Sequence, residues 1–312
     1  MKKKMLLAIT SIIVSLVTLS GCTLEQAKTV LTETNEALAK TENDYFPKES
    51  GIETPEWDME RVPQDLAEIM QTGVLVVGMR ECEDNIFAYH NEDGSYSGID
   101  INIAKDIAKS LGVTLKIKRD YATVNDMIPD LMDHKIDLII SNMTISPERV
   151  CYIYASSPYV QSKYSLMLNK SKLVRYEIEN NPLDFLRNHK TNIGVPMGSV
   201  YVNIVKEHFP KANVIEMDSR EELIQQVKEG KLSGYFEDTA MHMYFYAKDP
   251  ELSLKTKVFE FDDTSDDICI GIALDRPSLL EFVNAYVNTT NTITESEINS
   301  MCKAIFAGGE ND

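Results

Sequence analysis

Residues 137–149 read DLIISNMTISPER, an apolar run that ends in polar and charged residues. The run 137–141 has the composition of a buried strand, and the hydroxyls of Thr144 and Ser146 and the guanidinium of Arg149 follow it. Ligands of open α/β sheets bind beyond the carboxyl ends of the strands. A guanidinium offers a planar fork of donors that matches a carboxylate. The segment therefore predicts a site for the carboxylate of a small molecule.

Strand and helix patterns alternate on both sides of this segment. Between 99 and 112, apolar residues recur on one helical face, with Asp100 as an expected cap and Gly112 as the stop. Strands alternating with helices of this length predict parallel sheets covered on both faces, and two such series predict two α/β lobes. Helices are expected at 63–73, 99–112, 124–136, 199–209 and 219–230, and strands at 74–78, 113–118, 137–141, 191–195, 213–217 and 233–237.

The composition excludes some classes of function. The chain has 312 residues and a formal net charge of −18, with 49 acidic and 31 basic residues. It offers no basic face of the kind that nucleic-acid binding requires. The five histidines are scattered and no CxxC occurs, which argues against a zinc site. No metal and no cofactor are expected.

The N-terminus, MKKKMLLAITSIIVSLVTLSGC, has lysines, then an apolar stretch, then small residues. About 15 apolar residues cover roughly 22 Å as a helix, short of the ~30 Å hydrocarbon core of a membrane. Residues 1–21 are therefore expected to be a signal peptide. The ending Leu19-Ser20-Gly21-Cys22 resembles the bacterial lipobox, in which the cysteine is lipidated and holds the protein on a membrane. The alternative is an ordinary signal peptide followed by a chance cysteine.

Residues 22–63 are mostly polar and contain Pro47 and Pro55, so we expect a tether between the lipid and the folded body. Four further cysteines could pair in an exported protein, but their spacing does not say how. They are Cys82, Cys151, Cys269 and Cys302.

Longer stretches carry a resemblance to a known family. They are GVLVVGMRE, DGSYSGIDINIAKDIAKSLG, MIPDLMDHKIDLIISNMTISPERV, GVPMGSV, LIQQVKEGKLSGYFEDTA and GIALDRPSLLEFVNAYVNT. The chain resembles the amino-acid-binding proteins of ABC importers, the type II periplasmic solute-binding proteins. The likeness covers about residues 64 to 306, and the Thr-Ile-x-Pro-Glu-Arg segment is its most specific part.

The resemblance implies an α/β fold with two lobes, each a mainly parallel sheet flanked by helices. Lobe 1 would comprise 64–161 and 268–312, and lobe 2 would comprise 162–267. Two crossover strands near 159–163 and 267–270 would form the hinge, and the helices from Pro277 onward would return to lobe 1. The ligand would bind between the lobes, and the cleft would close on it.

The resemblance also implies roles for single residues. Arg149 and Thr144 keep the family's five-residue spacing, so Arg149 would grip the α-carboxylate of the ligand, and Thr144 would add its hydroxyl and backbone N–H. The backbone carbonyl of Asn142 would meet the α-ammonium group. Asp238 stands where the family places the acid that binds this ammonium, and its neighbour Glu237 is an alternative partner.

Other candidate residues concern the ligand's side chain. Family members that bind aspartate or glutamate carry a similar Gly-x-Arg-Glu, so Arg80 would meet a distal carboxylate, or would pair with Glu81 instead. Phe87 and Tyr89 are candidates for an aromatic wall. Ser199 would lie at a helix N-terminus, either facing the ligand or simply capping the helix. The resulting hypothesis is an acidic amino acid.

These features favour a monomeric, non-catalytic binding protein that delivers a free amino acid to ABC permease and ATPase subunits. One alternative is an enzyme like the prephenate and arogenate dehydratases of the same fold, with Glu81, Glu237 or Asp238 as general acid. No nucleophile–base pair is visible in the sequence. The other alternative is a lipoprotein that senses its ligand without transport.

Overall fold

The protein is described by a computed structural model, which covers residues 43–46, 57–81, 85–91, 94–175, 182–261, 264–290 and 292–307. The chain divides into two units, Met1–Tyr45 and Phe46–Asp312. The predicted signal peptide, Cys22, most of the predicted tether and Cys82 lie outside the described residues. None of the described helices combines the length and the apolar character that crossing a membrane requires.

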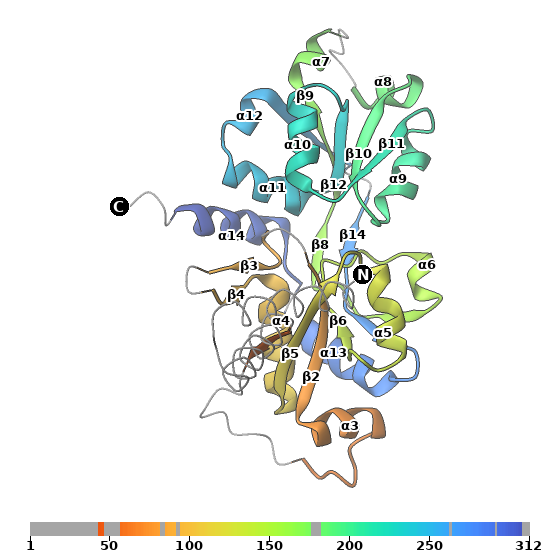
Figure 1. Cartoon of the computed structure of the whole chain (residues 1–312), viewed down its shortest axis with the longest axis vertical. Helices are drawn as coiled ribbons and strands as arrows, with labels where there is room; N and C mark the ends of the chain where they lie inside the picture. The colour runs from red at the N-terminus through yellow and green to blue at the C-terminus, as the bar shows by residue number, and fades with distance from the viewer. Residues whose placement is uncertain are drawn as a thin grey trace, which may run out of the picture. The chain divides into compact units, whose positions relative to one another are not determined.

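Strand β1 (Asn43–Phe46) spans the boundary between the units, and the other elements belong to the second unit (Figure 1). They begin with α3 (Gln64–Thr72), β2 (Val74–Arg80), β3 (Tyr89–His90), β4 (Tyr96–Ser97), α4 (Ile99–Leu111), β5 (Thr114–Tyr121), η1 (Asn125–Met127), α5 (Ile128–Met132), β6 (Leu138–Ile139), α6 (Pro147–Val150), β7 (Ile153–Ala155) and β8 (Val160–Ser162). They continue with β9 (Tyr164–Asn169), α7 (Lys170–Arg175), α8 (Pro182–Asn188), β10 (Asn192–Pro196), α9 (Tyr201–His208), β11 (Asn213–Met217), α10 (Arg220–Lys228), β12 (Gly234–Asp238), α11 (Thr239–Lys248), α12 (Leu252–Lys255) and β13 (Thr256–Glu260). They end with β14 (Asp266–Ile268), β15 (Gly271–Ala273), α13 (Pro277–Thr290) and α14 (Glu295–Ala307).

Two sheets organise the second unit. One has the order β5-β2-β6-β15-β7, in which β2 runs parallel to β5 and β6 while β15 is antiparallel to its neighbours. The other has the order β11-β10-β12-β9-β13, in which β10 runs parallel to β11 and β12 while β9 is antiparallel to β12 and β13. Helices and strands alternate as the sequence predicts, and helices pack against both sheets.

The chain passes between the sheets on paired strands. β8 and β14 pair antiparallel, Val160 with Ile268 and Ser162 with Asp266, within a residue of the predicted crossover segments. A further segment joins them, because the N–H of Gln161 bonds to the carbonyl of Ile293. These connections form the hinge region that the resemblance implies.

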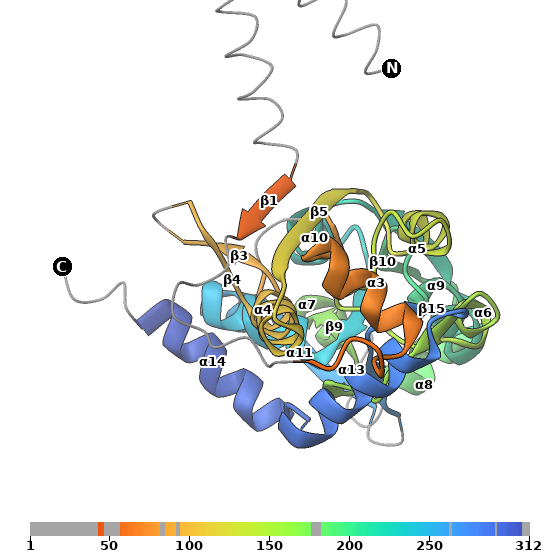
Figure 2. The same cartoon turned by 90° about the horizontal axis from the view of Figure 1, so that it is seen from below.

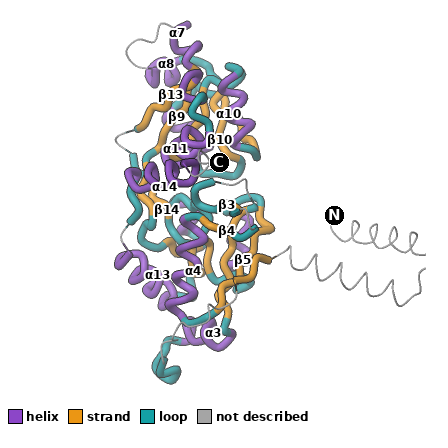
Figure 3. Tube along the Cα trace, turned by 90° about the vertical axis from the view of Figure 1, so that its left-hand side faces the viewer, coloured by secondary structure: helices purple, strands orange, loops and turns teal. Residues whose placement is uncertain are grey.

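The last two helices pack on different parts of the molecule. α13 lies against α3 (Figure 2) and contacts β15 of the first sheet. α14 lies against α11 (Figure 3), a helix that contacts strands of the second sheet, and the rings of Phe306 and Tyr244 are 5.3 Å apart. The resemblance implies that both helices belong to lobe 1. In the structure α14 packs against α11, and its buried residues Ile298 and Cys302 belong to the same apolar cluster as residues of α11.

The start of α4 differs from the expectation in one respect that matters for the site. Gly98, at φ 124°, occupies the N-cap position, and Asp100 lies inside the first turn and is buried. A Cβ at position 98 would lie 2.4 Å from the backbone oxygen of Phe87, so only glycine fits. Asp100 therefore does not cap the helix. Its carboxylate accepts instead from the Tyr159 hydroxyl at 2.7 Å and from the Asn142 backbone N–H at 2.9 Å.

Candidate functional site

Residues at the carboxyl ends of strands from both sheets meet at one small cavity. Arg80 ends β2, Asn142 follows β6, Ser199 follows β10, and Glu237 is the penultimate residue of β12. The cavity volume is about 20 Å³, room for about one water molecule. The two sheets therefore approach each other closely here. The cavity is lined by Arg80, Val124, Asn142, Thr144, Arg149, Met197, Gly198, Ser199, Val200, Tyr201, Arg220 and Glu237.

Arg149 lines this cavity and is only 5% exposed. Its Nη1 donates to the Thr144 carbonyl at 2.7 Å and its Nε donates to Asn125 Oδ1 at 3.2 Å, both uncharged acceptors. Among the described residues, no carboxylate forms an ion pair with this guanidinium. Burial, and secondly the charge of Arg80, lower the pKa of Arg149 to about 10, so it stays charged at neutral pH. A buried charge without a counterion is costly, and an anionic ligand would remove that cost.

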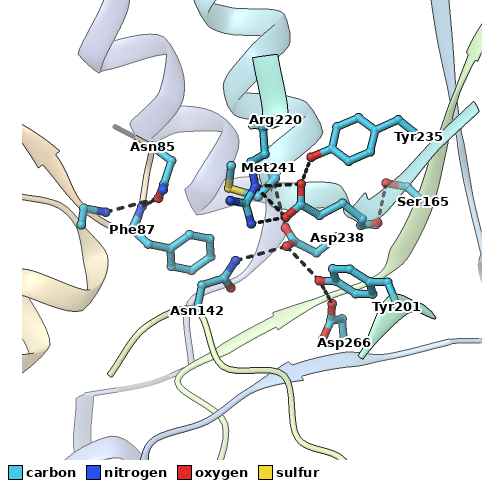
Figure 4. Close-up of polar contacts among 12 residues, drawn as sticks. Asn85, Phe87, Asn142, Ser165, Tyr201, Arg220, Tyr235, Asp238, Met241 and Asp266 are labelled. Carbon is cyan, nitrogen blue, oxygen red and sulfur yellow. Dashed lines mark hydrogen bonds and ion pairs between the residues drawn. The ribbon is translucent and has the colours of Figure 1, made fainter. Parts of the chain in front are cut away.

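Thr144 and Asn142 hold the loop that leads into α6, the helix that carries Arg149. Thr144 is buried and forms a β-bridge with Ile268, which ties the loop to strand β14. Asn142 adopts φ 45°, in the left-handed region, and its Nδ2 donates to Asp238 Oδ2 at 3.3 Å (Figure 4). Its Oδ1 is buried and has no hydrogen-bond partner among the described residues. Asn142 thus connects the first sheet to the acid of the second.

The two neighbouring acids of β12 have different partners. Glu237 is fully buried and forms a bidentate contact with Arg220, at 2.8 Å and 3.1 Å from Nε, and it also accepts from the Tyr235 hydroxyl. Asp238 is equally buried, and its Oδ1 accepts from the backbone N–H of Met241, which caps α11. Arg220 offsets the charge of Glu237, whereas no cationic side chain of the described residues contacts Asp238.

Asp266 is a further buried carboxylate, and Tyr201 connects it to Asp238. The Tyr201 hydroxyl is 3.2 Å from Asp238 Oδ2 and 2.7 Å from Asp266 Oδ2 (Figure 4). Burial, and then the charge of Asp238, raise the pKa of Asp266 to about 8, and burial also raises the pKa of Asp238. Asp266 belongs to β14, so this cluster reaches from the cavity into the hinge region.

Arg80 and Ser199 both line the cavity. The backbone N–H of Arg80 bonds to Ser141 Oγ at 2.9 Å, which fixes the end of β2 beside the end of β6. Ser199 precedes α9, whose N-cap position is Val200. The Oγ of Ser199 makes no capping bond, and this buried atom has no partner among the described residues. Ser199 therefore does not cap the helix, which was one of its two expected roles.

The two predicted aromatic residues lie apart from each other. Phe87 is buried, its backbone N–H bonds to Asn85 Oδ1 at 2.8 Å, and its ring extends toward the polar cluster (Figure 4). It does not line the cavity. Tyr89 lines a different, largely apolar cavity of about 400 Å³, which residues of α4, α13 and α14 also line. The aromatic wall expected from these residues is therefore not assembled at the site.

Sequence reasoning missed Arg220, Tyr201 and Asp266. Arg220 follows the N-cap residue Ser219 and so begins α10, where the helix dipole disfavours a cation. A basic residue at that position was the one signal in the sequence that a buried acidic partner exists. Tyr201 and Asp266 gave no signal, since they are 65 residues apart and come together only in the folded chain.

Comparison with known proteins places the chain in a family. The sequence profile of the bacterial extracellular solute-binding proteins, family 3, matches residues 75–311. The chain belongs to this family. The predicted family and the predicted two-lobe fold are thus confirmed, and the protein is extracytoplasmic.

Individual relatives of this solute-binding protein are moderately similar. It is 30% identical over 196 residues to the glutamine-binding protein of Geobacillus stearothermophilus, which covers 62% of this chain and 72% of that protein. It is 25% identical over 188 residues to the ABC transporter arginine-binding protein 1 of Escherichia coli, covering 60% and 73%. The crystal structure of an ancestral amino acid-binding protein, a precursor of cyclohexadienyl dehydratase, is 26% identical with a TM-score of 0.62 and covers 77% of this chain and 98% of that one.

Proposed function

We propose that this solute-binding protein binds an α-amino acid between its two sheets and delivers it to an ABC importer. Arg149 would grip the α-carboxylate, and Asp238 would receive the α-ammonium group. The relatives named for glutamine and arginine support an amino acid as the ligand class.

The observation that carries the proposal is a buried cation at the cavity and a buried anion in contact with two of the residues that line it. Arg149 lines the cavity and contacts uncharged acceptors. Asp238 does not line it but contacts two residues that do, Asn142 and Tyr201, and its donors among the described residues are neutral. A zwitterion supplies a carboxylate for the first and an ammonium for the second. Because charged hydrogen bonds are worth about 1.5–3 kcal/mol each, both groups would favour such a ligand.

The size of the cavity requires movement on binding. A space of about 20 Å³ is too small for an amino acid. The strands β8 and β14 connect the sheets, so a change in their backbone angles would separate the sheets and admit the ligand. The Asn142–Asp238 contact joins residues of the two sheets beside the cavity and would open in that motion.

For the ligand's side chain, the lining favours an acidic residue. Arg220 and Glu237 offset each other's charge, and Arg80 adds a second guanidinium beside Arg149. With the α-carboxylate at Arg149, a distal carboxylate would contact Arg80. Glutamine and arginine are the alternatives, because relatives are named for each of them.

Calorimetric titration of refolded protein with glutamate, aspartate, glutamine and arginine tests this proposal. We expect glutamate or aspartate to bind more tightly than glutamine. Tight binding of arginine with no heat from glutamate would refute the acidic assignment and leave amino-acid binding intact. Failure of all amino acids to bind would refute the proposed function itself.

Delivery also requires that the protein stay near its permease and ATPase partners. We propose that a lipid on Cys22 anchors the mature, monomeric chain, with residues 22–63 as the tether. Lipid chains are needed for anchoring because an acidic chain gains nothing from an anionic membrane surface. Replacing Cys22 by serine should release the protein from the membrane fraction into the medium, and retention in the membrane fraction would contradict lipid anchoring.

The enzyme alternative has a specific precedent in the ancestral protein described as a precursor of cyclohexadienyl dehydratase. Such chemistry needs a general acid free to donate a proton. Glu237 is committed to Arg220, which makes it a poor candidate for that role. Incubation with prephenate or arogenate, followed by chromatography for an aromatic product, would reveal this activity.

A further inference from the structure

Tyr201 lies between two carboxylates, and its single hydroxyl proton is too few for the two hydrogen bonds that the distances indicate. Its hydroxyl oxygen is 2.7 Å from Asp266 Oδ2 and 3.2 Å from Asp238 Oδ2 (Figure 4). Both aspartates are 0% exposed and Tyr201 is 4% exposed. A phenol has one proton to donate. If both aspartates were ionised, one of the two contacts would bring lone pairs together without a proton between them.

One more proton in the group removes this conflict. Asp238 accepts from the Met241 N–H and from Asn142 Nδ2 as well as facing Tyr201, so it is the better stabilised anion. Asp266 faces Tyr201 and the hydroxyl of Thr144. The proton is therefore best placed on Asp266, which donates to the Tyr201 oxygen while Tyr201 donates to Asp238.

The surrounding charges agree with this placement. From β12, Glu237 and Asp238 oppose ionisation of Asp266, although Arg220 offsets the first of them. Arg149 of α6 is a cation that acts on Asp266, but it bonds to uncharged acceptors. Tyr164 of β9 and Cys269 in the segment after β14 also interact electrostatically with Asp266. The next residue of β14 is a further acid, Asp267.

We propose that Asp266 is a positioning residue that holds a proton and, through Tyr201, prepares Asp238 for the ligand, so that ligand binding releases this proton. The inference rests on the proposed function. A ligand ammonium at Asp238 would take the place of the Tyr201 donor. Tyr201 would then turn its proton to Asp266, whose own proton leaves to the solvent. No covalent bond other than this O–H bond changes.

The release gives ligand binding a defined pH dependence. The pKa of Asp266 in the ligand-free protein is raised to about 8, chiefly by burial. A cation nearby stabilises its ionised form and lowers that pKa. Binding therefore becomes tighter as pH rises toward 8, and Kd should fall by roughly tenfold or more between pH 6 and pH 8.

Calorimetry in buffers of different ionisation enthalpy measures the number of protons released at pH 7, with the tightest-binding amino acid as probe. Wild type should release about one proton per ligand. D266N should bind with no release and with a flat pH profile, because its amide donates to Tyr201 as the protonated acid does. D267N changes the adjacent, half-buried aspartate of the same strand and should behave as wild type. Equal release by wild type and D266N, or none by wild type, would overturn the inference.

An infrared measurement separates this inference from the proposed function. A buried protonated carboxyl group has a C=O stretch that an ionised one lacks. At pH 7 without ligand, the band should be stronger in wild type and D267N than in D266N, because the buried carboxyls of Asp100 and Glu237, whose pKa values burial raises to about 7, contribute to it in all three proteins. If the band is stronger in wild type than in D266N and no amino acid binds, the proton-holding pair stands and the proposed function fails. If amino acids bind and the wild-type band is no stronger than that of D266N, the pair is wrong. Where D266N does not fold, the loss of band intensity on adding ligand to wild type and D267N gives the same test, and an unchanged band would overturn the pair.

Discussion

Replacing Arg149 by lysine keeps a positive charge at the cavity but removes the planar fork of N–H donors. In the structure, Nε bonds to Asn125 and one N–H of Nη1 bonds to the Thr144 carbonyl. The remaining donors of Nη1 and Nη2 face no protein acceptor among the described residues, so they are the pair that would meet a carboxylate side by side. A lysine ammonium provides only a point charge there.

The expected loss follows from these contacts. One charge-assisted hydrogen bond to the ligand disappears, which costs about 1.5–3 kcal/mol. Since about 1.4 kcal/mol corresponds to a tenfold change, Kd should rise by roughly ten- to a hundredfold. Stability should change less, because lysine can still reach the Thr144 carbonyl.

Calorimetric titration of R149K against wild type measures the change in Kd. R187K is the matched control, because Arg187 is a half-exposed arginine paired with Asp184 on α8, far along the chain from the cavity. Thermal unfolding of each variant shows whether it is folded. An R149K protein that folds and binds its amino acid with unchanged affinity would refute the assignment of Arg149 to the carboxylate.

Three further outcomes are expected. R220A leaves Glu237 buried without its cationic partner and should lower the free energy of unfolding in urea by about 3–5 kcal/mol; a loss below about 0.5 kcal/mol, typical of a surface site, would contradict the bidentate pair. N142G keeps the positive φ but removes the donor to Asp238, so X-ray scattering of the ligand-free protein should show a larger radius of gyration, and an unchanged radius would mean that this contact does not hold the cavity closed. G98A places a Cβ 2.4 Å from a backbone oxygen at a position with φ 124°, so its Tm should fall clearly, whereas a Tm equal to that of wild type would contradict this close approach.

Much of the framework follows from local patterns. The apolar face of α4 and its stop at Gly112, with φ 72°, need only residues within about four positions of each other, which is the range of helical side-chain contacts. The cap at Ser219 is equally local, since its Oγ accepts from the N–H of Glu222. The strand ends at which candidate residues gather follow from the alternation of strands and helices.

The expectations that differ from the structure concern the direction in which a single side chain points. Asp100 was expected to cap α4, but the N-cap residue is Gly98, at a position where no Cβ fits. The Asp100 carboxylate accepts hydrogen bonds from Tyr159 and Asn142 instead. Tyr89 lies in the loop expected to shape the site, yet it lines another cavity. Sequence spacing does not show where a loop side chain points, because the packing of distant helices decides its direction.

The fold, the family and the cavity-lining place of Arg149 could be predicted from the amino-acid sequence, because they depend on periodic patterns and on one contiguous motif. Which of the two neighbouring acids is neutralised could be seen only in the folded chain. Glu237 and Asp238 are adjacent and chemically similar, but Arg220, 17 residues before Glu237, offsets one charge and leaves the other. The same holds for Asn142 with Asp238, 96 residues apart, and for Tyr201 with Asp266. Electrostatic partners are set by distances in space, and burial makes their charges count, so neither can be read along the chain.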